Sequence, residues 1–361
     1  MKGLVLLAAG GTGGHLFPAE ALGLTLAARG WNVHLATDRR IESYGRDFPA
    51  EQIHFIRSAT LSGSPLEAAG AVFTLAAGYL QARWLISRLK PAAAVGFGGY
   101  PTVPPILAAV SAHVPTVVHE QNAVLGRANK FLAPRVTRLA TSFAVVGGAE
   151  ALKGKVVQTG NPVRPAVIAA AAAPYPVRTA GEPFRLTIFG GSQGAQFLSD
   201  VVPAAVAMLT RDTQGRLRIT QQCRPEDIGR VRQAYELLGV QAELQSFFAD
   251  LPKRIAASHL VVSRSGASTC TELAVIARPA IMVPLPHAID QDQRANAEVL
   301  AAAGGGWMIP QADLTAQRLA AELERLIKAP DRLAEASAAA RSVSRPDAVD
   351  RLADLVEKVA A

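Results

Sequence analysis

The sequence has few cysteines, few aromatic residues and no long apolar run free of proline. Its two cysteines, Cys223 and Cys270, cannot build a disulfide framework, and no cysteine–histidine cluster has zinc spacing, so a reducing cytoplasm is expected. Prolines interrupt the longest uncharged stretch, residues 91–118, which excludes a lipid-exposed helix there. Aromatic residues make up 6% of the chain, and no helix-turn-helix or RNA-binding signature is present. Nucleic acid is therefore excluded as a partner.

Acidic residues are scarce in the first half of the chain. Residues 1–164 contain 16 Lys and Arg against 8 Asp and Glu, whereas the remaining residues contain 21 of each. The whole net charge of +8 therefore lies in the first half. Between Ala68 and Ala149 the only acidic residue is Glu120. Such a surface is either an ordinary solvated basic face or one that attracts an anionic membrane.

Glycine, in contrast, is concentrated in three turns, Gly10–Gly14, Gly96–Gly99 and Gly190–Gly194. The first and third follow an apolar run and precede a helix-like segment, the arrangement in which backbone N–H groups receive phosphate. A tight βα connection without a ligand is the alternative. The first turn lacks the third glycine of the G-x-G-x-x-G dinucleotide motif, although Asp38 after the second apolar run keeps a dehydrogenase open.

Apolar runs of strand length alternate with segments of helix length along the whole chain. This pattern predicts an α/β fold with two Rossmann-like, doubly wound parallel-sheet domains. The predicted strands are Gly3–Ala9, Trp31–Ala36, Ile53–Ile56, Ala93–Gly96, Thr116–His119, Val136–Ala140, Arg185–Phe189, Leu217–Thr220, Glu243–Phe247, Leu260–Ser263, Ala280–Val283 and Trp307–Ile309. The predicted helices include Pro18–Arg29, Leu66–Lys90 and, with breaks near Pro330 and Pro346, Asp313–Ala361.

An Ala- and Pro-rich stretch, Ala169–Pro183, resembles a linker between the two domains. We predict an N-terminal domain of residues 1–163, with the helix of residues 342–361 packing back on it, and a C-terminal domain of residues 164–341. Ligands of such sheets bind beyond the carboxyl ends of the strands. We therefore expect the three glycine turns to line one interdomain cleft.

Polar residues after two strands of the second half could bind a nucleotide sugar. Ser265–Thr269 opens a helix whose N–H groups can approach a pyrophosphate, and Glu272, one turn later, could accept both ribose hydroxyls. A capped helix with a first-turn acid is the alternative. A second cluster suits sugar hydroxyls or, through its carboxylates, a metal ion. It comprises Asp290, Asp292, Gln293 and Asn296.

Two histidines are candidates for acid–base chemistry. His15 ends the first glycine turn, where it could act as a general base, hold a phosphate oxygen or cap the helix. His119 and Glu120 end a predicted strand beside the second glycine turn. They could bind an acceptor, supply a base or form a satisfied structural pair.

Taken together, the motifs resemble those of the MurG family, the bacterial N-acetylglucosaminyltransferases that convert lipid I to lipid II. They read GGTGGHxFP from Gly10, GFGGYP from Gly96, HEQN from His119, GNPVR from Gly160, GGSQG from Gly190 and RSGAxTxxE from Arg264, in the family's order. The resemblance implies the GT-B fold. It also implies an inverting transfer of GlcNAc from UDP-GlcNAc to the 4-hydroxyl of the MurNAc unit on undecaprenyl pyrophosphate, a step of peptidoglycan synthesis.

The resemblance further implies which residues bind the substrates. The donor residues are Thr12, Gly13, Gly14, Asn122, Arg164, Ser192, Gln193, Gly194, Phe248, Ala267, Ser268, Thr269, Glu272 and Gln293. Gly98, Gly99 and Tyr100 are expected to bind the acceptor, His15 is the first choice for the base, and His119 or Glu120 is the alternative. Backbone N–H groups, helix dipoles and Arg164 can stabilise the departing diphosphate, so we expect neither a metal ion nor a cofactor.

The chain departs from the family pattern in two places. Ala277 stands where the family usually has a glycine ending the helix after Glu272, so that cap must differ. The loop before Gln293 varies in length within the family, which leaves the register of Gln291 and Gln293 open.

A helical stripe in the basic half carries apolar residues bordered by cations. It comprises Val72, Phe73, Ala76, Tyr79, Leu80, Arg83 and Trp84, and Arg88 and Lys90 follow. Such a face lies at a membrane interface, or else it packs in the core. With a lipid-linked acceptor, we expect peripheral attachment to the cytoplasmic side of the inner membrane through Phe73, Tyr79, Arg83 and Trp84. Cell-wall synthesis or division proteins are candidate partners.

Two other functions stay open. A UDP-GlcNAc 2-epimerase-like enzyme would share the fold and the donor but would use no lipid acceptor. A non-catalytic nucleotide-sugar binding protein would bind the donor without turnover.

Overall fold

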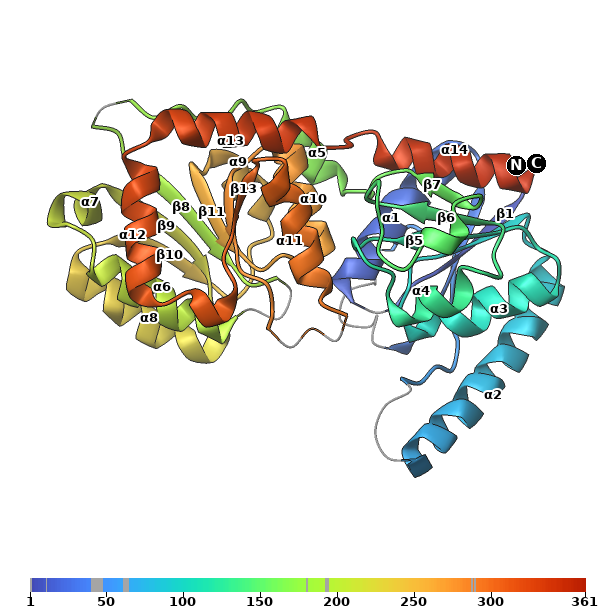
Figure 1. Ribbon diagram of the computed structural model, residues 1–361. Coiled ribbons are helices and arrows are strands. Elements are labelled where there is room, and N and C mark those ends of the chain that lie inside the picture. Colours follow the sequence, from blue (N-terminus) through green and yellow to red (C-terminus); the bar gives the residue numbers. More distant parts are fainter. Residues whose placement is uncertain are drawn as a thin grey trace. The chain divides into compact units, whose positions relative to one another are not determined.

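The computed structural model describes residues 2–10, 12–39, 48–60, 65–179, 181–191, 195–286, 288 and 290–361. The chain divides into two units, Met1–Arg164 with Arg345–Ala361, and Pro165–Ser344. Each unit contains a parallel sheet with helices on both faces (Figure 1), which confirms the expected α/β class.

The sheet of the first unit has the strand order β3-β2-β1-β4-β5-β6-β7, and neighbouring strands pair in parallel. Its strands are β1 (Leu4–Ala8), β2 (Asn32–Thr37), β3 (Gln52–Phe55), β4 (Ala93–Gly96), β5 (Thr116–Glu120), β6 (Arg138–Thr141) and β7 (Val156–Gln158). The sequence did not predict β7, because this edge strand is only three residues long and half-buried. The strand order reverses direction at β1, the point where ligands of such sheets bind.

Alternate residues of β1 enter separate cores on the two faces of this sheet. Val5 and Leu7 pack with α1 (Gly13–Ala28) and α14 (Ala348–Ala360). Leu6 and Ala8 pack with α2 (Pro65–Leu89), α3 (Val103–Ser111) and α4 (Arg127–Leu132). The prediction that the first helix begins at Pro18 was wrong, because α1 starts inside the glycine turn and continues through this proline.

The last helix, α14, is tied to the first unit by an ionic network. The Arg29 guanidinium lies 2.9 Å from Asp350, 2.6 Å from Asp354 and 3.0 Å from Glu357. Glu357 also accepts hydrogen bonds from Trp31 at 2.8 Å and from Lys2 at 2.9 Å. The bond from Trp31, followed by that from Lys2, lowers the pKa of Glu357 to about 2.

The sheet of the second unit has the order β10-β9-β8-β11-β12-β13, again with parallel neighbours. Its strands are β8 (Phe184–Phe189), β9 (Leu217–Gln222), β10 (Gln241–Gln245), β11 (Leu260–Ser263), β12 (Ala280–Met282) and β13 (Gly306–Met308). The expected strand Glu243–Phe247 was misplaced by two residues, because Gln241 already pairs with Arg218 of β9 and the strand ends before Phe247.

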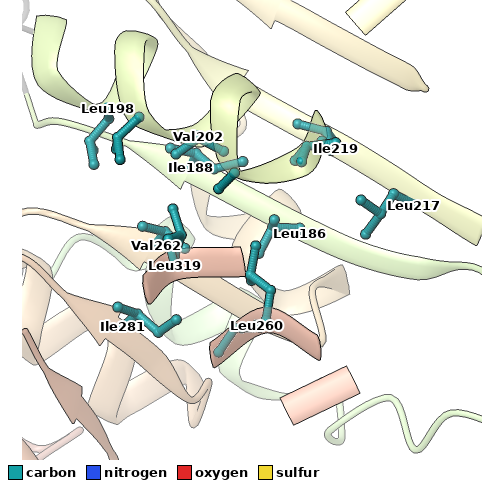
Figure 2. Packing of buried hydrophobic residues seen from close by; sticks show 14 of the residues in the cluster. Leu186, Ile188, Leu198, Val202, Leu217, Ile219, Leu260, Val262, Ile281 and Leu319 are labelled. Carbon is teal, nitrogen blue, oxygen red and sulfur yellow. The ribbon is translucent and has the colours of Figure 1, made fainter. Parts of the chain in front are cut away.

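Three helices cover one face of this sheet, α6 (Gln196–Ala207), α8 (Pro225–Leu238) and α12 (Ala316–Ile327). Figure 2 shows the core between them and the sheet, where Leu186 and Ile188 of β8 meet Val202 of α6. The connections through α9 (Leu251–Ala257) and α10 (Ala267–Ile276) run in the opposite direction along the sheet. Because such connections are right-handed, these two helices cover the other face.

The remaining helices connect these layers. They are α5 (Pro165–Ala171), α7 (Arg211–Arg216), α11 (Asp292–Ala302) and α13 (Pro330–Ser342). Since α5 reaches Ala171, the predicted linker Ala169–Pro183 was wrong over its first residues.

Candidate functional site

The first glycine turn delivers the N-terminus of α1 beyond the end of β1. Thr12 is the N-cap residue, but its hydroxyl does not cap the helix. Its Oγ1 instead lies 2.9 Å from Nδ1 of His15. The first N–H groups of the helix, at Gly13 and Gly14, are therefore not capped by this side chain and point at the position where such turns receive anions.

The second glycine turn packs directly against His15. Gly98 and Gly99 have φ values of 85° and 75°, which only glycine adopts readily. A Cβ atom at Gly98 would lie 3.4 Å from Nε2 of His15, and one at Gly99 would lie 3.6 Å from its Cε1. The fold thus brings the first two glycine turns together around one half-buried imidazole. Tyr100, which follows Gly99 in the chain, is also half-buried.

His15 can act as a base only in one tautomer. If Nδ1 carries the proton, it donates to the Thr12 hydroxyl, and Nε2 is then the nitrogen with the lone pair that can accept a proton. The ring then has its second nitrogen on the side of the Gly98 turn. This geometry suits a general base better than a helix cap.

His119 is completely buried, which argues against its role as a base. Its Nε2 lies 2.9 Å from the carbonyl oxygen of Gly160, and its Nδ1 lies 3.2 Å from Nε2 of Gln121. Burial lowers its pKa to about 4. Both ring nitrogens are occupied within the first unit, so the alternative of a structural pair is favoured over catalysis.

Glu120 organises the loop that follows β5. Its Oε1 accepts from the backbone N–H of Asn122 at 3.0 Å and from the Asn122 side chain at 3.2 Å. Its Oε2 accepts from Gly126 at 2.9 Å and from Asn129 at 2.8 Å. Burial raises the pKa of this carboxyl, and these four bonds oppose the rise. Glu120 therefore positions Asn122 and is not aimed at an acceptor.

Arg164 stacks on an aromatic residue that the sequence reasoning did not select. Its guanidinium carbon lies 4.4 Å from the ring centroid of Phe17 on α1. A Cβ at Gly13 would lie 3.1 Å from the same ring, so glycine at this position leaves room for Phe17. Burial raises the pKa of the nearby Glu20 carboxyl, and the charge of Arg164 opposes it. Phe17 belongs to the first motif, which was the available signal for its role.

In the second unit, α10 presents an open N-terminus after β11. Gly266 is its N-cap residue and contributes no side-chain cap. The buried hydroxyl of Ser268, in the first turn, finds no hydrogen-bond partner among the described residues. Ala267 and Glu272 are also buried, each with 8% of its surface exposed. The third glycine turn is described only up to Gly191, so Ser192, Gln193 and Gly194 lie outside the described residues.

Hydrogen bonds hold the loop after β12 against the N-terminus of α10. The Ser265 hydroxyl donates to the carbonyl of Gln293 at 2.8 Å, and Asn296 donates to the carbonyl of Ser265 at 3.2 Å. Gln293 Oε1 accepts from the N–H of Leu285 at 3.1 Å. The Gln291 amide instead donates to Ala288 within its own turn, which favours Gln293 as the residue turned toward the helix start.

A buried arginine also holds the loop after β12 in place. Arg264, two residues before Gly266, donates to the carbonyls of Val283 and Pro284 at 3.1 and 3.3 Å and to the Gln311 side chain at 2.6 Å. Burial lowers its pKa. In the sequence this arginine stands out only as part of a motif, and its role in holding the loop was not predicted.

The C-terminal cap of α10 differs from what the sequence predicted. Ala277 was expected to force a different cap, but it adopts the left-handed conformation of a glycine cap, with φ of 58°. The strain is offset by the fully buried Arg278, whose guanidinium donates to Ile276 and Ala277 at 2.7 and 3.0 Å. It also donates to Ala256 at the end of α9.

The two phenylalanines after β10 differ in exposure. Phe248 is 5% exposed and Phe247 is 65% exposed. The guanidinium of Arg254 stacks on Phe248 at 4.4 Å. The inward position of Phe248 fixes the backbone of this segment close to the end of β10.

The structure describes Asp290 and Asp292 but gives them no metal-like setting. Asp292 Oδ1 accepts from the N–H of Gln293 at 2.9 Å, in the first turn of α11. Across the described ranges, no group of three or more His, Cys, Asp or Glu side chains is arranged to hold a metal ion.

The stripe on α2 is largely exposed. Phe73 is 78% exposed, Leu80 67%, Trp84 59% and Val72 57%, while Arg88 stacks on Trp84 at 4.8 Å. These residues therefore do not pack in the core. Tyr79 is the exception, because it packs against the core and donates its hydroxyl to Ser111 at 2.9 Å. Among the described helices, none has both the length and the hydropathy to cross a membrane.

Comparisons with known proteins agree with the motifs. Residues 5–141 match the glycosyltransferase family 28 N-terminal domain, and residues 185–352 match its C-terminal domain. A relative from Chelativorans sp. (strain BNC1) is 57% identical over 357 residues, covering 99% of this chain and 95% of its own. One from Allorhizobium ampelinum is 55% identical over 360 residues, covering 99% and 96%. Both are named UDP-N-acetylglucosamine--N-acetylmuramyl-(pentapeptide) pyrophosphoryl-undecaprenol N-acetylglucosamine transferase.

Solved structures give the same answer for the fold. The crystal structure of Acinetobacter baumannii MurG is 28% identical, with a TM-score of 0.79 and 99% of each chain covered. A UDP-GlcNAc 2-epimerase from Neisseria meningitidis, 13% identical with a TM-score of 0.68 over 98% of this chain and 100% of its own, shares the fold alone. The chain therefore has the GT-B fold and belongs to the MurG family of N-acetylglucosamine transferases, within glycosyltransferase family 28.

Proposed function

We propose that this protein transfers GlcNAc from UDP-GlcNAc to the 4-hydroxyl of the MurNAc unit of lipid I, which yields lipid II and UDP. The observation that carries the proposal is the 57% identity over 357 residues to a transferase of that name. The first unit supplies the acceptor side and the second unit binds most of the donor.

The proposed reaction inverts the anomeric carbon. The acceptor oxygen forms the new C–O bond from the face opposite UDP, the bond from the anomeric carbon to the diphosphate breaks, and the hydroxyl proton passes to Nε2 of His15. In the tautomer that this step requires, Nδ1–H donates to the Thr12 hydroxyl, 2.9 Å away. Gly98, Gly99 and Tyr100 border the acceptor.

The leaving diphosphate gains negative charge as the bond breaks. We propose that the N–H groups of Ala267, Ser268 and Thr269, the turn of Ser192–Gly194 and the guanidinium of Arg164 stabilise it. The orphaned Ser268 hydroxyl supports this assignment, because a buried polar group without a partner suits a ligand oxygen.

We also assign residues to the ribose, the uracil and the sugar of the donor. Glu272 accepts the ribose hydroxyls, Phe248 offers its backbone to uracil, and Gln293 donates its amide nitrogen to the sugar while its oxygen holds Leu285. Gly13, Gly14 and Asn122 complete the set from the first unit, where Glu120 fixes the position of Asn122.

The membrane assignment is proposed on the exposed part of the α2 stripe. Phe73, Leu80 and Trp84 supply apolar burial, and Arg83 and Arg88 supply attraction to anionic lipid. Attachment would be peripheral, on the cytoplasmic side of the inner membrane, next to a lipid-linked acceptor. Proteins of cell-wall synthesis or division are candidate partners at that surface.

The test is incubation with UDP-GlcNAc and a short-chain lipid I analogue, with and without EDTA, followed by mass spectrometry. We expect addition of one GlcNAc and release of UDP in both arms. Conversion of UDP-GlcNAc without the acceptor would indicate an epimerase instead, and binding without any product would indicate a sensor. Loss of single-turnover activity in EDTA, restored by one divalent ion, would show that Asp290 and Asp292 bind a metal.

A further inference from the structure

A groove lined by polar and apolar residues lies on the sheet of the second unit. Of the residues assigned to the donor, Phe248 contacts the groove's border through Arg254. The groove has a volume of about 440 Å³ and is bordered by β8, β9, β10 and α9. Leu186 and Ile219 point to the opposite face, into the core with α6 and α8, so their neighbours on the strands point into the groove. The β8–β9 and β9–β10 connections cover the other face, whereas the β10–β11 connection crosses this face through α9, which borders the groove.

Two arginines stand side by side in this groove. Arg185 of β8 is the register partner of Arg218 of β9, so their side chains leave the same face of adjacent strands. Two like charges at directly opposite positions repel each other, so this pair of arginines does not stabilise the sheet. Among the described residues neither guanidinium forms an ion pair. Arg218 donates to the carbonyls of Gly215 and Leu217, and the exposed Glu182 interacts with Arg185 through its charge.

The other charged groups of the groove are already paired. Arg254 of α9 lies at ion-pair distance from Glu243 of β10 and 2.7 Å from Asp250, and it also stacks on Phe248. His259, below Arg185, accepts from the Arg185 backbone at 2.8 Å. Burial lowers its pKa to about 4, so it adds no charge at neutral pH. The groove therefore keeps the positive charge of Arg185 and Arg218.

Hydroxyl-bearing residues lie next to the two arginines on the same face of β8 and β9. Thr187 of β8 is the register partner of Thr220 of β9, one step along from the two arginines. The Thr187 hydroxyl lies 2.6 Å from that of Ser258, and Thr220 is half-exposed. Arginine and hydroxyl donors on one face are the usual partners of phosphate oxygens, and guanidinium groups bind them in a bidentate manner.

We propose that this groove binds a small phosphate-bearing ligand between Arg185 and Arg218. Its volume lies within the range of small-molecule sites, which is about 300–1,000 Å³. The arginines occupy the second position of their strands, whereas the donor residues of this unit follow the carboxyl ends of its strands. We therefore expect UDP and the groove ligand to bind at the same time. Only the test, which fills the donor site with UDP, rests on the proposed function.

The test is titration of the full-length protein with inorganic pyrophosphate by calorimetry, in the presence of saturating UDP. We expect saturable binding that the double variant Arg185→Gln with Arg218→Gln weakens at least tenfold, while UDP binding stays intact. The matched control is Arg232→Gln, an exposed arginine of α8 on the other side of the sheet. The control variant should bind pyrophosphate as the wild type does.

A second variant keeps the proposal testable if the double variant does not fold. Thr220→Asp places a carboxylate at a half-exposed position, two residues from Arg218 on the same face, and should abolish pyrophosphate binding. Absence of saturable binding to the UDP-bound wild type, or equal binding to the Thr220→Asp variant, would overturn the proposal.

Discussion

Phe17 offers the sharpest test of how the donor site is held together. Its ring lies between Gly13 and the guanidinium of Arg164, 4.4 Å from the guanidinium carbon. Replacing Phe17 by leucine removes the aromatic face but keeps an apolar side chain of similar reach. Arg164 should then lose the orientation in which it meets the diphosphate.

The magnitude follows from the contact. A cation–π interaction contributes about 0.5–1 kcal/mol when exposed and about 2 kcal/mol when desolvated, and both residues here are half-buried. At about 1.4 kcal/mol per factor of ten, Phe17→Leu should raise the Kd for UDP-GlcNAc roughly 2- to 30-fold. Phe17→Tyr keeps the ring and should stay close to the wild type. Phe143→Leu, at a half-buried phenylalanine packed on the core of the same unit, is the matched control.

The assay is calorimetric titration with UDP-GlcNAc in a double-mutant cycle of Phe17→Leu and Arg164→Gln. We expect a coupling energy of about 0.5–2 kcal/mol between the two changes. Additive effects on Kd would refute the positioning role, even if each single variant binds weakly. An unchanged Kd for Arg164→Gln alone would instead remove Arg164 from the donor site.

Four further outcomes are expected. His15→Ala should lower kcat by about 10²–10⁴-fold with little change in donor Kd, and a loss confined to donor binding would leave His15 as a phosphate ligand. Arg278→Met should destabilise the second unit by about 3–5 kcal/mol in chemical denaturation, because carbonyls at the ends of α9 and α10 lose their donor; a loss below 1 kcal/mol would contradict this. Glu357→Gln should lower the Tm at pH 7, since the depressed pKa of about 2 gives stability that is complete above pH 4.5 and is lost as the pH falls toward 2; an equal deficit at pH 2 would count against the network. Replacing Phe73 and Trp84 by serine should release the protein from anionic vesicles and spare turnover of a water-soluble acceptor, whereas unchanged vesicle binding in a folded variant would place the attachment elsewhere.

Much of the fold could be predicted because its strands and helices follow local patterns of apolar residues. Ala93–Gly96 and Leu260–Ser263 are buried on both faces, and their uninterrupted apolar runs gave the strand bounds correctly. β10 is an edge strand with exposed residues on one side, so its pattern is weaker and its predicted position slipped by two residues. The periodicity of α2 predicted a helix but could not tell a core face from a surface. Only the packing of Ala82, Leu85 and Ile86 against the sheet decided that Phe73 and Trp84 face outward.

Features that depend on distant partners were out of reach of the sequence. Ala277 looked incompatible with a left-handed cap, because a non-glycine residue in that conformation costs about 1–2 kcal/mol. The compensation comes from Arg278, whose guanidinium reaches the ends of two helices and the chain at Pro174. No local rule pairs an alanine with the arginine that follows it in this way.

For the second glycine turn, the sequence explained only part of why glycine is needed. Glycine-rich turns were interpreted as places where backbone approaches phosphate or acceptor. Gly98 and Gly99 do need positive φ, but the group that occupies the space beside them is the imidazole of His15 from the first turn. A Cβ atom at Gly98 would lie 3.4 Å from Nε2, the nitrogen that we propose as the proton acceptor. The two glycines therefore leave room for this imidazole as well as shaping the turn, so Gly98→Ala should lower the kcat measured with a lipid I analogue even if the acceptor still binds.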